Sequence, residues 1–310
     1  MDIERVHPEL QEMARKAPAI DVGSRVMRTV ARVGSRHLLP RAKLPDVVVR
    51  NVTEGPARLR LYSPTAATGA ALVWVHGGGM VIGAPRQDDR FCARTASRLG
   101  ITIASVDYRL APEHPYPAPV EDCRAVWEWL HRKAADLGVD PDRIAIGGGS
   151  AGAGLAASLV NALHDRGGNQ PAAQWLLYPM LDDRTAADRT LDGIGHYVWT
   201  NVSNRVGWTA YLRGTALPGS NAVPPGAAPA RRTDLTGLPS AWIGVGDIDL
   251  FHDEDVDYAR RLHAAGVPVQ LDVLPGGPHG FESLAPDAPV VGAFVRNAQD
   301  WLADALRPRP

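Results

Sequence analysis

The sequence predicts an α/β fold in which a mostly parallel central sheet is flanked by helices and carries a helical cap. Short apolar runs of strand length alternate with longer segments of helical periodicity, as expected when helices cover both faces of such a sheet. The run at 71–75, Ala-Leu-Val-Trp-Val, is apolar throughout, which is typical of a strand buried on both faces. Residues 183–239 interrupt the alternation and are too many for a structureless loop, so we expect them to contribute to the cap.

The composition is that of a globular protein without an evident macromolecular partner. Of the 310 residues, 45% are hydrophobic and 22% are charged, which is ample material for a core. The formal net charge of −1 gives no sign of a surface for nucleic acid or an anionic membrane. Cys92 and Cys123 lack ligand-like spacing and suggest free thiols. Because the sequence contains no bilayer-spanning apolar run and no signal-peptide pattern, we expect a cytoplasmic protein.

The chain ahead of the first strand is expected to be an addition to the main fold. Apolar residues recur at helical spacing between residues 7 and 39, which predicts two helices broken near Pro18, and we expect their apolar side chains to be buried. The predicted division is cap helices at 1–45, an α/β core at 46–182 and 240–310, and a cap insertion with a linker at 183–239.

From residue 47 onward the pattern is that of the sheet and its covering helices. Two short runs at 47–52 and 58–62 flank Glu54-Gly55-Pro56, and this turn predicts a hairpin. The aromatic residues of the insertion, Tyr197, Trp199, Trp208 and Tyr211, are expected to lie in helices that cover the active site. Further strands are predicted at 71–75, 101–106, 144–146, 175–178, 241–245 and 267–273, and helices at 90–99, 120–137, 151–163, 254–265 and 288–306.

A Gly-x-Ser-x-Gly pattern at 148–152 stands between a predicted strand and a predicted helix. This context is typical of the nucleophile elbow of α/β-hydrolases, a strained turn that presents Ser150 at a helix N-terminus. The pattern is common, and an ordinary glycine-rich turn or a phosphate loop is the alternative. Other residues therefore have to decide between these interpretations.

A second glycine-rich loop, His-Gly-Gly-Gly at 76–79, follows the strand at 71–75 directly. Glycines allow main-chain N–H groups to converge on one point, as the stabilisation of an oxyanion requires. A phosphate loop normally ends in Lys and then Ser or Thr, whereas Met80 and Val81 follow here. We expect His76 to hold the loop through its ring nitrogens rather than to act as a base.

A serine nucleophile needs a histidine base and an orienting acid, which in this fold follow in the order Ser, acid, His. Asp247 and Asp249 follow the predicted strand at 241–245, and His279 follows the strand at 267–273. The carboxyl ends of parallel strands share one edge, where open α/β sheets bind ligands. His279 alone could be a solvated loop histidine, but with the other motifs it indicates catalysis. The run His252-Asp253-Glu254-Asp255 could suggest a metal site, although an acidic helix start explains it better.

Together these motifs resemble the hormone-sensitive-lipase-like esterases over most of the chain from residue 47. The resemblance implies a capped α/β-hydrolase fold and carboxylesterase activity on short or medium acyl esters, without cofactor or metal. By matching positions, Ser150 is the nucleophile and His279 the base, and Gly77, Gly78 and Ala151 supply the oxyanion-hole N–H groups. The motifs that carry the resemblance lie at 76–79, 107–113, 148–152, 178–179 and 279–281.

Two positions depart from the family pattern. Gly149 stands where the family usually has Asp or Glu before the nucleophile. The acid motif of the family opens Asp-Pro-Leu-x-Asp-Glu, and the best match here, at 249–254, lacks the proline. Asp249 is therefore our choice for the orienting acid, with Asp247 as its rival.

The predicted function is that of a serine carboxylesterase acting on a small-molecule ester. We expect Trp199, Trp208 and Met27 of the cap segments to contact the substrate. An amidase or peptidase with the same machinery is one alternative, and a binding protein that has lost catalysis is another. The intact Ser, His and acid argue against the second. A homodimer is an expectation from the family alone.

Overall fold

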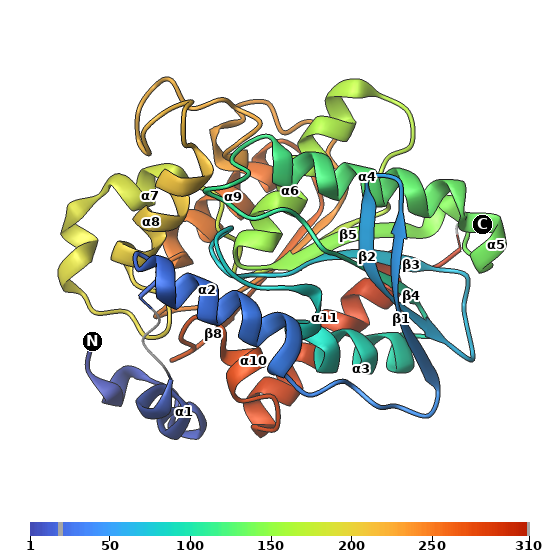
Figure 1. Cartoon of the computed structure of the whole chain (residues 1–310), viewed down its shortest axis with the longest axis horizontal. Helices are drawn as coiled ribbons and strands as arrows, with labels where there is room; N and C mark the ends of the chain where they lie inside the picture. The colour runs from blue at the N-terminus through green and yellow to red at the C-terminus, as the bar shows by residue number, and fades with distance from the viewer. Residues whose placement is uncertain (18–20, 309–310) are drawn as a thin grey trace.

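The computed structural model describes residues 1–17 and 21–308 and has an eight-stranded sheet at its centre (Figure 1). The strand order is β1-β2-β4-β3-β5-β6-β7-β8, in which the pairs β1–β2 and β2–β4 are antiparallel and the other neighbours are parallel. The mostly parallel sheet and the predicted hairpin are thereby confirmed. The strands are β1 (Val47–Glu54), β2 (Ala57–Pro64), β3 (Ala71–Val75), β4 (Thr102–Val106), β5 (Ile144–Gly149), β6 (Gln174–Leu177), β7 (Ala241–Gly246) and β8 (Val269–Leu274).

Helices cover both faces of the sheet, as the alternation predicts (Figure 1). Along β3, Val73 and Val75 belong to the hydrophobic core that contains residues of α4, α6 and α9, whereas Leu72 and Trp74 belong to the core that contains residues of α3 and α11. The helices are α1 (Gln11–Lys16), α2 (Arg25–Val33), α3 (Asp89–Leu99), α4 (Ala118–Arg132), α5 (Ala134–Leu137), α6 (Ala151–Arg166), α7 (Asp183–Ala187), α8 (Asn201–Tyr211), α9 (His252–Ala264), α10 (Phe281–Leu284) and α11 (Pro289–Ala305).

The long insertion between β6 and β7 holds α7 and α8 (Figure 1, yellow). Trp208 and Tyr211 lie in α8, as predicted for the aromatics of this segment. Tyr197 and Trp199 instead precede the helix, which corrects the prediction for these two. The side chain of Thr200 accepts a hydrogen bond from the N–H of Ser203, and this N-cap fixes the start of α8.

The apolar face of α2 is exposed, contrary to the expected burial of apolar side chains in the N-terminal segment. Val26, Met27, Val30 and Val33 keep 71%, 41%, 59% and 49% of their surface exposed. The opposite, basic face docks instead. Arg32 donates to the main-chain oxygens of Val81 (2.8 Å) and Ala111 (2.7 Å) and forms an ion pair with Glu113. Helical spacing shows which side chains share a face, but here the arginine contacts decide which face points inward.

Two further expectations are a break between the N-terminal helices near Pro18 and the absence of a membrane-spanning segment. The predicted break near Pro18 lies outside the described residues. Within 1–17 and 21–308, no helix combines the length and the apolarity needed to cross a membrane.

Candidate active site

Ser150 lies in the sharp turn between β5 and α6. Its backbone has φ 57° and ψ −125°, a strained conformation for a residue with a side chain. The turn brings the start of α6 against β3: a Cβ on Gly152 would lie 2.1 Å from the main-chain oxygen of Val75. The residue two positions after the serine must therefore be glycine, which explains that part of the motif.

His279 and Asp249 meet Ser150 from the neighbouring strand ends. Nε2 of His279 lies 2.8 Å from Oγ of Ser150, and Nδ1 lies 2.8 Å from Oδ2 of Asp249. All three residues are at least nine-tenths buried. Such a chain lets the histidine accept the serine proton while the carboxylate stabilises the resulting imidazolium.

Asp247, the rival acid, has a different partner. Its Oδ1 accepts a hydrogen bond of 2.6 Å from the N–H of Gly276, in the loop that leads to His279. The loops after β7 and β8 are also in close contact, because a Cβ on Gly246 would lie 1.8 Å from the main-chain oxygen of Gly277. The geometry therefore favours Asp249 as the partner of the histidine and gives Asp247 a role in holding the loop.

The loop after β3 lies directly beside the serine. A Cβ on Gly77 would be 3.3 Å from Cβ of Ser150, and Gly78 has φ 117°, which only glycine adopts readily. Over the described parts of the chain, the main-chain N–H groups of Gly77, Gly78 and Ala151 donate to no protein acceptor. The three predicted oxyanion donors are thus free to bind one.

His76 holds this loop, as expected, although through one ring nitrogen only. Its Nδ1 lies 2.8 Å from the main-chain oxygen of Gly77, and Nε2 is buried without a partner in the described chain. The ring stacks on Tyr108 at a centroid distance of 4.2 Å. Burial lowers the pKa of His76 to about 4, so the ring is neutral at physiological pH.

A cavity of about 240 Å³ opens beside Ser150 and His279. Four aromatic side chains form part of its wall. Trp199 is part of the lining, whereas Trp208 and Met27 are not, which corrects the substrate contacts expected for these two. Trp208 is fully buried in the core through α8, and Met27 lies on the exposed face of α2. The aromatic lining residues are Trp74, Phe91, Tyr178 and Trp199.

Two acidic residues that the sequence analysis missed also line this cavity. Asp88 accepts a hydrogen bond of 2.7 Å from Nε1 of Trp74, and Glu282 accepts one from the hydroxyl of Tyr178. Burial, with a contribution from the nearby charge of Glu282, raises the pKa of Asp88 to about 7. Single carboxylates in ordinary helical context carry no sequence signal, so these residues could not be picked out.

The family departure at Gly149 falls in the same cavity. A Cβ at this position would have Trp74 and Tyr178 as neighbours at 3.8 Å, which is ordinary contact distance. Glycine here therefore leaves open a space that an acidic side chain would occupy. The absence of a side chain at position 149 leaves the serine–histidine–aspartate chain intact.

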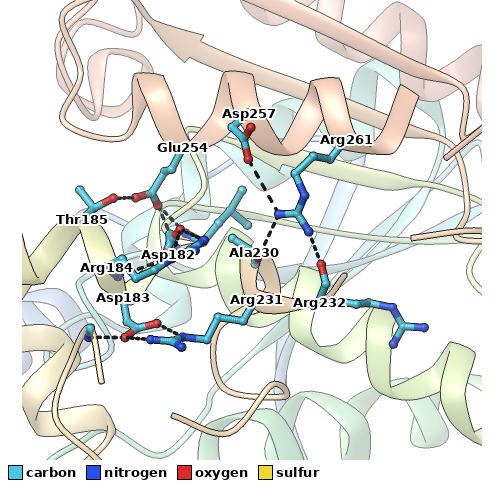
Figure 2. Close-up of polar contacts among 12 residues, drawn as sticks. Asp182, Asp183, Arg184, Thr185, Ala230, Arg231, Arg232, Glu254, Asp257 and Arg261 are labelled. Atoms are coloured by element: carbon cyan, nitrogen blue, oxygen red, sulfur yellow. Dashed lines mark hydrogen bonds and ion pairs between the residues drawn. The ribbon is translucent and has the colours of Figure 1, made fainter. Parts of the chain in front are cut away.

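A polar network connects the start of α9 with the chain after β6 (Figure 2). The buried carboxylate of Glu254 accepts hydrogen bonds from the N–H groups of Leu181 (2.7 Å) and Asp182 (3.1 Å) and from the hydroxyl of Thr185. The acidic run at 253–255 begins α9, as predicted, but Glu254 also ties that helix to the chain after β6. Because Asp249 lies just ahead of α9, this tie helps to hold it in place.

Further polar contacts in Figure 2 connect α7 and α9 with residues 230–232, in the segment that leads back to β7. Asp183 is fully buried and accepts two hydrogen bonds from Arg231, of 2.6 and 2.9 Å. Arg261 of α9 donates to the main-chain oxygens of Ala230 and Arg232. The linker that returns the chain to β7 is therefore fastened to both α7 and α9.

Asp255 of α9 provides a test of stability against pH. It is fully buried, neither carboxyl oxygen has a partner in the described chain, and burial raises its pKa well above the ordinary value. The folded protein thus keeps a proton that the unfolded chain releases near pH 4. The stabilisation is complete below that pH and is lost as the pH rises toward the folded-state pKa.

We therefore expect Asp255→Asn, which cannot ionise, to lose less stability than the wild type between about pH 4 and pH 8, by at least about 1 kcal/mol. Urea unfolding at several pH values measures this difference. Asp253→Asn is the control on the same helix, because its side chain is fully exposed. Parallel stability curves for wild type and Asp255→Asn would contradict the assignment.

Comparison with known proteins agrees with this architecture. A family model described as alpha/beta hydrolase fold matches residues 72–283. The Carboxylesterase NlhH of Mycobacterium tuberculosis is 35% identical over 291 residues, covering 89% of each chain. The chain belongs to the hormone-sensitive-lipase-like carboxylesterase family. The expected fold and the expected enzyme class, a carboxylic ester hydrolase, are confirmed.

Other members of this carboxylesterase family are similar as well. The Carboxylic ester hydrolase LipN of Mycobacterium tuberculosis is 39% identical over 238 residues, covering 74% of this chain but only 62% of LipN. The solved structure of a bacterial heroin esterase superposes with a TM-score of 0.92 at 34% identity, covering 99% of both chains.

Among the described residues, His, Cys, Asp and Glu form no group of three or more that could hold a metal ion.

Proposed function

We propose that the protein is a serine carboxylesterase that hydrolyses short- to medium-chain acyl esters through an acyl-enzyme. The hydrogen-bonded chain from Ser150 through His279 to Asp249, with its two contacts of 2.8 Å, is the observation that carries the proposal. The unbonded N–H groups beside the serine and the small aromatic cavity support it. A cavity of about 240 Å³ suits a small ester.

The reaction follows from the positions of these groups. Ser150 attacks the ester carbonyl while His279 takes its proton, and Asp249 stabilises the imidazolium. The oxyanion binds to the N–H groups of Gly77, Gly78 and Ala151. His279 then protonates the leaving alcohol and later activates the water that releases the acid.

A hydrolysis screen tests this function and its alternatives. p-Nitrophenyl acetate, butyrate, hexanoate and decanoate are compared with p-nitroanilides of the same acids. We expect turnover of the esters, with the highest kcat/KM among the shorter chains, and far slower cleavage of the anilides. Comparable rates on esters and anilides would favour an amidase. Absence of turnover on every compound would favour a binding protein.

The proposed acyl-pocket role of Trp199 gives a specificity prediction. Its indole ring packs on the glycine loop, since a Cβ on Gly79 would lie 2.3 Å from that ring, and it lines the cavity. Trp199→Ala should open this wall and raise the ratio of kcat/KM for hexanoate over acetate by about tenfold or more. Trp208→Phe, a change in the core away from the cavity, should leave the ratio unchanged. If both variants had the same hexanoate-to-acetate ratio as the wild type, Trp199 would have no role in acyl-chain specificity.

The remaining parts of the proposal concern the cap and the assembly. We assign residues 1–45 and 183–239 to a cap, supported by Val198 and Trp199 in the cavity wall and by the contacts of Arg32 with the main chain of Val81. A cytoplasmic location and a homodimer stay predictions of the sequence. Size-exclusion chromatography with light scattering measures the assembly.

A further inference from the structure

A second cavity, of about 350 Å³, lies outside the proposed active site. It is formed where the chain after α2 meets the hairpin of β1 and β2, the end of β4 and the loop ahead of α3. Its lining is strongly basic, because it contains five arginines. They are Arg36, Arg41, Arg58, Arg60 and Arg86.

Two of the five charges are neutralised by acidic partners. Arg36 donates to both carboxylate oxygens of Asp107, at 2.9 and 2.7 Å. Arg60 donates to both oxygens of the buried Asp89, at 2.5 and 2.7 Å. These bidentate pairs hold the cavity wall and leave little positive charge free.

The other three charges have no acidic partner within the described chain. Arg58 donates to the main-chain oxygen of Asp107 at 3.4 Å. Arg86 donates to main-chain oxygens in the segment 36–39, and its Nε is buried without a partner. Arg41 is exposed and its side chain makes no hydrogen bond or ion pair among the described residues. Neutral carbonyl groups do not compensate a cation, so three guanidinium charges share one concave space.

We propose that this cavity binds a small anion carrying phosphoryl groups. Like charges gathered in a concave space focus a positive potential that attracts anions. The planar guanidinium group presents parallel N–H donors that match two oxygens of a phosphoryl group, a geometry that an ammonium group cannot offer. Three uncompensated charges suit a doubly or triply charged ligand, such as a diphosphate.

The basic cavity lies next to the cavity beside Ser150. One loop separates it from the cavity beside Ser150: Ala84, Pro85 and Arg86 line the basic cavity, and Gln87 and Asp88 line the other. Arg41 comes from the N-terminal segment and Arg86 from the shared loop, so an anion bound by both would link the two segments. The proposed anion site shares no lining residue with the substrate cavity and is therefore distinct from it.

Calorimetric titration of the full chain with sodium pyrophosphate, at constant ionic strength in sodium chloride, tests the proposal independently of esterase activity. We expect saturable binding to one site. Arg41→Gln combined with Arg58→Gln should weaken binding by at least about tenfold, because each removes a charged hydrogen bond to the ligand. Both side chains are exposed, so the variant should fold, which its thermal transition will verify.

Arg25→Gln combined with Arg213→Gln is the matched control, since it removes the same charge from exposed positions outside this cavity. This variant should bind pyrophosphate like the wild type. A wild-type titration without saturable binding would overturn the proposal. Equal weakening by the two double variants would also overturn it. That result would show that binding depends on the overall charge of the protein and not on this cavity.

Discussion

Ser150→Ala should lower kcat on p-nitrophenyl acetate by about 10⁴- to 10⁶-fold and leave the fold intact, as removal of a catalytic serine does in a well-studied protease. The substitution removes the hydroxyl that lies 2.8 Å from Nε2 of His279 and changes nothing else in the turn. Steady-state kinetics and the thermal transition measure the two parts of the prediction.

Ser158→Ala is the matched control for this experiment. Ser158 lies on the same helix and is buried, and its hydroxyl has no partner in the described chain. The same chemical change there should leave kcat within a few-fold of the wild type. If Ser150→Ala kept more than a small fraction of the activity, or if both variants lost it equally, the serine mechanism would be wrong.

Asp249→Asn should lower kcat by about 10⁴-fold, because the carboxylate that accepts a hydrogen bond from His279 also fixes the tautomer of the ring. Oδ2 of Asp249 faces Nδ1 of the histidine, while Oδ1 accepts a hydrogen bond of 3.0 Å from the N–H of Phe251. An asparagine keeps the shape but loses the charge that stabilises the imidazolium. The measurement is kcat of Asp249→Asn and of Asp247→Asn, at a pH where wild-type activity is maximal.

Asp247→Asn is the comparison, two residues away and of the same chemistry. Its carboxylate holds the N–H of Gly276 and does not contact the histidine ring, so we expect a loss of about tenfold at most. The reverse ranking of the two variants would show that the orienting acid has been assigned to the wrong residue.

The inner strands of the sheet, β3 to β7, could be predicted well because they are buried on both faces. The strand predicted at 71–75 has the observed bounds of β3, since every residue in it is buried and turn residues flank it. The edge strand β8 begins at Val269 rather than at 267. Several of its side chains are only half-buried, so the apolar pattern marks its start poorly.

The meeting of Ser150, Asp249 and His279 could be anticipated because carboxyl ends of parallel strands share one edge of a sheet. The inward orientation of the basic face of α2 could not be predicted. Helical spacing shows which residues share a face, but not which groups of the core that face will contact. Trp208 illustrates the same limit. An aromatic residue in an insertion can fill the core or line the cavity, and only the packing of α8 decides.

Covalent labelling with a p-nitrophenyl phosphonate, followed by intact-mass and peptide-mass analysis, tests the central claim most directly. A phosphonate reacts with an activated serine and remains attached, so the label reports the nucleophile itself. The account predicts one adduct per chain, located on Ser150, together with complete loss of esterase activity. An inactivated protein that carried its label on another residue, with Ser150 unmodified, would contradict it.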